Sequence, residues 1–332
     1  MFDILELPFL QTALLAGTCL AVVAAAMGYF LILRGLTFAG HALPNIGFAG
    51  AAGAVLLGLN PLVGLFVFTM AAGVSIAMLG KEAHKRDITI GIIMTFALGL
   101  GMLFLALYSG YAERVYSILF GTILGISQQD VLVTAVAGAL TLAVLLAIWR
   151  PLLFSSLDPQ VAQARGVPVR LLAIVFLVLV AISVSIAIQV IGVLLVFVLL
   201  VGPAATAVRL TQRPPWAVMI AMLLGVLYTW LGIVLAALSG TWPVSFLIAT
   251  ISFLVYLPVR LLSPRWMQRA DKRRQESRAE ALFPLMTKEV AVVPSSTVSS
   301  FSWAAPDTSQ QFATPGIDDA GAVSDAWREY NV

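Results

Sequence analysis

The chain contains a series of uncharged apolar runs, each about as long as a helix must be to cross a lipid bilayer. A hydrocarbon core of about 30 Å takes roughly 20 helical residues, and every backbone polar group inside it must be satisfied internally. Hydrophobic residues make up 61% of the 332 residues and charged residues only 11%. Because soluble domains carry about a quarter charged residues, the sequence predicts an all-α polytopic membrane protein.

These runs predict about nine transmembrane helices, or eight if one run is re-entrant. The predicted spans are 10–33, 38–57, 61–79, 88–109, 130–149, 170–187, 189–208, 216–238 and 243–259. With the N-terminus outside, nearly every lysine and arginine falls on the inner side, and only Arg114 falls outside. By the positive-inside rule this asymmetry predicts a plasma-membrane protein with a cytoplasmic C-terminal tail.

Charge divides the chain into two predicted parts. Residues 1–263 form the transmembrane domain, in which each acidic residue can be placed in a loop or at a membrane surface. Residues 264–332 begin with the basic cluster "PRWMQRADKRRQESRAE" and continue as a tail rich in Ser, Thr, Pro, Ala and Asp. Such a composition predicts a basic juxtamembrane segment followed by disorder. The single cysteine, Cys19, cannot form a disulfide or a Cys-based zinc site within the chain.

The sequence lacks the parts that would let the chain power transport by itself. The only Gly-Lys pair, Gly80-Lys81, is followed by Glu82 and is not a P-loop, so we expect no nucleotide hydrolysis and no enzymatic activity. The spans also lack the carboxylates typical of proton or sodium relays. A powered transporter of this kind would need a motor on another polypeptide.

One long inner connection, "SSLDPQVAQARGVPVRLL", predicts a short surface helix. Ser155, Ser156 and Asp158 are candidate N-caps, and the helix should stop at Gly166. Its residues alone allow two interpretations, a linker at the membrane surface or a docking helix for a cytosolic partner.

Several segments together resemble one family of transporters. They are "PFLQTALLAG", "RGLTFAGHAL", "DITIGIIMTFALGLG", "LFGTILGIS" and "LDPQVAQARGVPV" followed by "QVIGVLLVFVLLVGPAATAVRL". In this order they resemble the permease subunits of ATP-binding-cassette (ABC) importers for zinc, manganese and iron, the ABC-3 type metal permeases. The resemblance covers about residues 8 to 262 and leaves the tail outside.

This resemblance implies the ABC-3 permease fold and a transport function. The expected cargo is a divalent transition metal, carried as substrate, with no covalently bound cofactor. The expected partners are a cytosolic ABC ATPase, an extracytoplasmic solute-binding protein, a second permease copy and the lipid bilayer, with no nucleic acid. The helix near 157–168 would be the ATPase-coupling helix, through Asp158, Ala162, Gly166 and Val167.

The second span departs from the family pattern. The family commonly has G-D-A-L-S-H, whereas this chain has Gly40-His41-Ala42-Leu43-Pro44-Asn45. His41 therefore replaces an aspartate and Asn45 replaces a histidine, but the two residues still share one helix face. We predict that His41, Pro44 and Asn45 line the substrate pathway and that His41 is a metal ligand. Alternatively, the polar pair makes hydrogen bonds that merely hold the span in place.

Three other functions stay open at this point. The chain could be a secondary carrier or channel that needs no ATPase, or an ABC permease for a metal chelate or another small solute. It could also be a non-transporting anchor whose basic segment binds anionic lipid. The scattered methionines, Met94 among them, are interpreted as packing residues, and His84 as a solvated loop residue.

Overall fold

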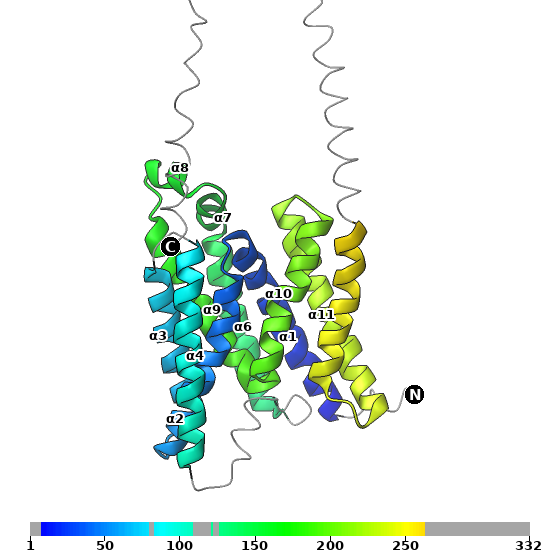
Figure 1. The fold of residues 1–332 in the computed structure, drawn as a ribbon. Helices are drawn as coiled ribbons and strands as arrows, with labels where there is room; N and C mark the ends of the chain where they lie inside the picture. The colour runs from blue at the N-terminus through cyan, green and yellow to red at the C-terminus, as the bar shows by residue number, and fades with distance from the viewer. Residues whose placement is uncertain (1–7, 80–82, 109–120, 122–125, 263–332) are drawn as a thin grey trace, which may run out of the picture. The chain divides into compact units, whose positions relative to one another are not determined.

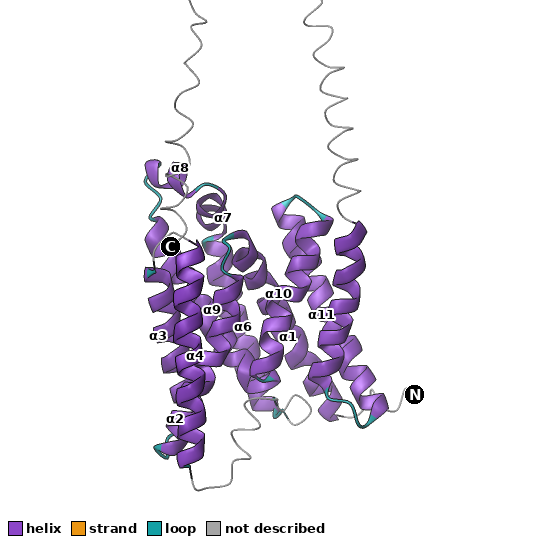
Figure 2. Cartoon of the chain, in the orientation of Figure 1, coloured by secondary structure: helices purple, strands orange, loops and turns teal. Residues whose placement is uncertain are grey.

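The computed structural model describes residues 8–79, 83–108, 121 and 126–262. These ranges form helices joined by short turns and contain no strand (Figures 1 and 2). The long helices are α1 (Pro8–Leu33), α2 (Thr37–Leu56), α3 (Pro61–Met78), α4 (Ala83–Leu107), α6 (Gln128–Ala147), α9 (Val169–Ile191), α10 (Val193–Leu210), α11 (Pro214–Ser239) and a final helix, Val244–Leu262. Two short helices are α7 (Trp149–Leu157) and α8 (Pro159–Ala164).

The long helices match the nine predicted spans one for one. Eight of them are long and apolar enough to cross a membrane, and α2 is the exception. It lies among the others and is largely buried, since 14 of its 20 residues are buried. The polar residues His41 and Asn45 lower the hydropathy of α2, and neighbouring helices shield it.

Burial separates inner helices from outer ones. In the most apolar part of each span, 72% of α1 and 67% of α9 is buried, against 17% of α4 and 22% of α6. The outer helices expose large apolar side chains, such as Ile92 and Phe96 of α4. Because lipid tails solvate such side chains, these surfaces suit contact with the bilayer.

Glycines allow close helix crossings at the centre. A Cβ on Gly50 of α2 would meet the carbonyl oxygen of Gly64 in α3, and a Cβ on Gly28 of α1 would meet the carbonyl oxygen of Leu200 in α10. Small residues of this kind drive helix packing in membranes, where apolar burial alone gives little driving force.

The boundary between the sixth and seventh spans lies further along the chain than predicted. The predicted spans 170–187 and 189–208 meet near residue 188, whereas α9 continues to Ile191 and the chain reverses at Gly192, whose φ is +79°. The apolar run continues through the reversal, so hydropathy does not mark it. Glycine adopts this φ at low cost, and it is the residue that sets the boundary.

One end of the bundle carries α7 and α8 and is called the α7–α8 end (Figure 1). By their positions in the chain, basic residues gather at this end. The arginines at the helix ends there are Arg34, Arg86, Arg150, Arg165, Arg170, Arg209, Arg213 and Arg260. The opposite end has no lysine or arginine among the side chains that the structure describes. Arg114 and the predicted 264–332 tail lie outside the described residues.

Candidate functional site

The polar face of α2 contains His41 and Asn45, one helical turn apart. The Nδ2 of Asn45 donates a hydrogen bond to the backbone carbonyl of His41, at 2.7 Å. The amide is therefore oriented by its own helix, and its Oδ1 makes no hydrogen bond within the described chain. This arrangement leaves an amide oxygen available on that face.

The imidazole of His41 is held by aromatic rings. It packs edge-to-face against Phe197 of α10 with ring centroids 4.8 Å apart, and Phe38 lies 6.5 Å away. Its Nδ1 is buried and has no hydrogen-bond partner among the described residues. The two side chains share a face, as predicted, and Asn45 bonds the backbone of His41 rather than its ring.

Met94 joins this pair from α4. Its sulfur lies 3.8 Å from Asn45 Nδ2, so the face presents an imidazole, an amide and a thioether. Sequence analysis treated Met94 as packing, because nothing in the chain indicates which residue of α4 meets Asn45. Only the packing of α2 against α4 identifies it.

Pro44 is buried in the middle of α2. It has no N–H, so the carbonyl of Gly40 lacks the helical donor that residue 44 would otherwise supply. This carbonyl immediately precedes His41 and adds a third oxygen or nitrogen acceptor to this part of α2, beside His41 Nδ1 and Asn45 Oδ1.

The polar face of α2 contains no acidic side chain. In the part of the chain that the structure describes, no three His, Cys, Asp or Glu side chains come together. The possible ligands for a cation are therefore an imidazole nitrogen, an amide oxygen, a carbonyl oxygen and a thioether sulfur, with no carboxylate among them. Such a set can coordinate a divalent ion but does not compensate its charge.

A second group of predicted residues builds α8 at the α7–α8 end. Oδ1 of Asp158 accepts hydrogen bonds from the backbone N–H groups of Gln160 (3.1 Å) and Val161 (3.0 Å), and Pro159 occupies the first helical position. Asp158 is thus an N-cap, as predicted, and proline at the next position is pre-organised for the helix.

The other end of α8 is closed by Gly166. Its φ is +81°, and the N–H of Val167 donates to the carbonyl of Ala162 at 3.0 Å, which forms a Schellman motif. Ala162 is fully buried, so it anchors α8 to the structure beneath it.

The prediction that Ser155 and Ser156 cap this helix is wrong. Both belong to α7, and both hydroxyls donate to the carbonyl of Leu152. The chain after Trp149 forms a separate helix first, so these serines come before the cap position.

An all-helical bundle with apolar outer spans, a buried polar helix and a surface helix at one end is the architecture of a polytopic membrane transport protein. The ABC 3 transport family matches residues 6–262, and the chain belongs to this family of transport permeases. The predicted family resemblance is confirmed.

The alignment with this chain covers most of the length of its named relatives. The manganese transport system membrane protein MntC of Halalkalibacterium halodurans is 32% identical over 70% of this chain and 80% of its own. The high-affinity zinc uptake system membrane protein ZnuB of Haemophilus influenzae is 29% identical over 67% of this chain and 85% of its own. The solved structure of PsaBC from Streptococcus pneumoniae in complex with Fab aligns with a TM-score of 0.69 and 29% identity, covering 78% of this chain and 93% of that one.

Proposed function

We propose that this chain is the permease subunit of an ABC importer that moves a divalent transition metal, manganese or zinc, across the plasma membrane. Family membership and the names of the manganese and zinc relatives support this class of cargo. The observation that carries the proposal is the polar face of α2, where His41, Asn45 and Met94 meet in a bundle whose core is mostly apolar.

The ligand chemistry suits a site that passes metal on. Imidazole nitrogen binds zinc and manganese, and amide oxygen is a weaker ligand than carboxylate. A pathway must bind its ion strongly enough to admit it and weakly enough to release it. A neutral set in place of the family's carboxylate therefore favours rapid release over tight binding.

One chain supplies few strong ligands for this task. The side chains of His41 and Asn45 provide one nitrogen and one oxygen, and the Met94 sulfur and the Gly40 carbonyl bring the set to four uncharged or weak donors at most, fewer than manganese takes. Two copies around a shared axis would double the set and place the pathway between them. His41 and Asn45 are only partly buried in the single chain, which suits contact with a second copy.

The α7–α8 end is assigned to the cytoplasm by its arginines. In this orientation α8 is the coupling helix, capped by Asp158 and Gly166, against which a cytosolic ATPase docks. ATPase closure moves α8, and the anchoring of Ala162 transmits the movement to the spans. The binding protein delivers metal at the opposite end, and the 264–332 segment extends into the cytoplasm.

The test is metal-resolved uptake into proteoliposomes that contain the permease, its ATPase and its binding protein. We expect manganese or zinc uptake that requires ATP hydrolysis and falls about tenfold or more in His41→Ala, since even indirect ligand partners cost this much in metal affinity. Asn45→Ala should lower uptake less, because amide oxygen is the weaker ligand.

Thr95→Ala is the matched control. Thr95 lies on the exposed side of α4 and its hydroxyl bonds only the carbonyl of Gly91, so this variant should keep parental uptake. Uptake that follows an ion gradient without ATP would contradict the ABC mechanism. ATP-dependent uptake of a metal chelate but not of free metal would favour the second candidate function, an ABC permease for a metal chelate. The missing carboxylate is the observation that supports this second candidate.

A further inference from the structure

A second polar feature, separate from α2's polar face, is a cavity of about 540 Å³ at the α7–α8 end. It opens between the ends of α1 and α3, the beginnings of α4 and α9, and the helices α7 and α8. Its polar lining comes from Arg34, Arg86, Arg170, Ser155 and Ser156, and the rest of the lining is mostly apolar. Among the residues that the structure describes, no carboxylate lines it.

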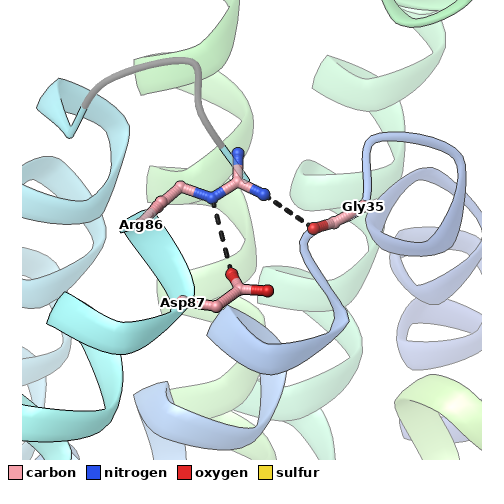
Figure 3. Close-up of polar contacts among 3 residues, drawn as sticks. All are labelled: Gly35, Arg86 and Asp87. Carbon is pink, nitrogen blue, oxygen red and sulfur yellow. Dashed lines mark hydrogen bonds and ion pairs between the residues drawn. The ribbon is translucent and has the colours of Figure 1, made fainter. Parts of the chain in front are cut away.

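Two of the arginines are held close together. Arg86 Nη2 donates to the carbonyl of Gly35, at 2.8 Å, in the turn that directly follows Arg34 (Figure 3). Burial, and after it the positive charge of Arg86, lower the pKa of Arg34. The two guanidinium groups therefore repel each other in a partly desolvated place.

The carboxylate of Asp87 does not neutralise the positive charge of the three arginines that line the cavity. Asp87 lies 3.7 Å from Arg86 Nε, and it is the only carboxylate paired with an arginine in the described ranges (Figure 3). The buried Nη1 of Arg34 has no hydrogen-bond partner in the same ranges, and Arg170 is exposed with no acidic partner there. Within the described ranges, three guanidinium groups thus face one cavity with one carboxylate beside them.

The lining matches an amphipathic anion. Guanidinium groups bind phosphate oxygens through paired charge-assisted hydrogen bonds, and serine hydroxyls can add to them. The apolar part of the lining includes Ile76, near the end of α3, and Ile174 and Leu177, within the first nine residues of α9. Basic pockets between transmembrane helices on the cytoplasmic side are suited to the head groups of anionic lipids.

We propose that this cavity binds the phosphate head group of an anionic phospholipid from the inner leaflet, with its acyl chains against the apolar ends of α3 and α9. The phosphate would accept hydrogen bonds from Arg34, Arg86 and Arg170. It would also fix the Arg34–Gly35 turn, which leads directly into α2. Lipid composition would then influence the helix that contains His41.

The test uses the full chain in phosphatidylcholine nanodiscs, with phosphatidylglycerol binding followed by native mass spectrometry. Phosphatidylglycerol should bind in preference to phosphatidylcholine, and Arg170→Gln should weaken its binding about fivefold, as expected for one cation at a membrane surface. Arg170 has no partner to lose in the described structure, so this variant should fold normally. Arg34→Gln is the second variant and should weaken binding by at least as much.

Arg213→Gln is the matched control, since Arg213 lies at the same end but does not line the cavity. An equal loss of binding in this control would mean general surface attraction and would overturn the proposal. Inorganic phosphate that binds the cavity as well as phosphatidylglycerol does would also overturn the proposal, because the ligand would then be a free anion. If binding of the ATPase always displaced the lipid, the cavity would belong to the interface with the ATPase, and this result would also overturn the proposal.

Discussion

The neighbouring helices α2 and α4 differ in both polarity and burial. Helix α2 contains a histidine, an asparagine and a proline, and the bundle buries 14 of its 20 residues. Helix α4 exposes apolar side chains over most of its span, of which only 17% is buried. The contrast teaches that the histidine and asparagine of α2 lie where neighbouring helices partly shield them, and that a hydropathy threshold alone leaves out the helix that contains them.

The largest expected difference between the two helices is in the loss of stability when a phenylalanine is replaced by alanine. Phe48 of α2 is 2% exposed and Phe96 of α4 is 71% exposed. Phe48→Ala should cost about 3 kcal/mol, chiefly through the cavity that it leaves. Phe96→Ala should cost little, because lipid fills the space. Thermal unfolding in detergent-lipid micelles measures both, and equal losses would contradict the assignment of inner and outer faces.

Glycines should show the next largest difference. Gly50→Ala would drive a methyl group into the backbone of α3 at Gly64, and overpacking of this kind costs about 1–3 kcal/mol. Gly99→Ala on α4 has open space around its Cβ and serves as the control. We expect the yield of monodisperse protein to fall for Gly50→Ala alone. Similar yields would mean that α2 and α3 pack less closely than described.

The altered ligand pair gives a third comparison, within α2 itself. The double variant His41→Asp, Asn45→His restores the family's carboxylate and imidazole on the same face. It should raise manganese affinity about tenfold, because a carboxylate compensates the ion's charge where an amide does not. Calorimetric titration of the purified complex measures this. An unchanged or weaker affinity would mean that residues 41 and 45 do not bind the metal.

The smallest expected effect on metal uptake concerns two adjacent residues of α4, Met94 beside Asn45 and the exposed Thr95. Met94→Leu keeps the volume but removes the sulfur beside Asn45, and it should change the ratio of zinc to manganese uptake about two- to threefold, as expected for loss of a soft ligand. Thr95→Ala should leave this ratio unchanged. If both variants leave it unchanged, Met94 is a packing residue, as its sequence alone indicated.

Most of the fold could be predicted from local chemistry. Apolar runs of membrane-spanning length set the number of helices, and Asp158-Pro159 and Gly166 define the ends of α8 because capping depends on nearby residues. The α9–α10 reversal was misplaced, since it lies inside a continuous apolar run and depends on the single residue Gly192.

The contacts between distant residues could not be predicted in the same way. Asn45 and Met94 are 49 positions apart, and Arg86 and Gly35 are 51 apart. Both contacts depend on how α4 packs against α2 and on the turn before α2. A single sequence contains the residue types for these sites but not the pairing of helix faces that brings them together.

The measurement that tests the central claim most directly is cysteine accessibility in membranes. The chain has one cysteine, so Cys19→Ala gives a cysteine-free background for Asn45→Cys and Phe96→Cys. With the partners present and ATP turning over, a small water-soluble thiol reagent should label residue 45, manganese should slow this labelling, and residue 96 should stay unlabelled. Labelling at 96 with none at 45 would contradict the account, since the aqueous pathway would then follow α4's outer face.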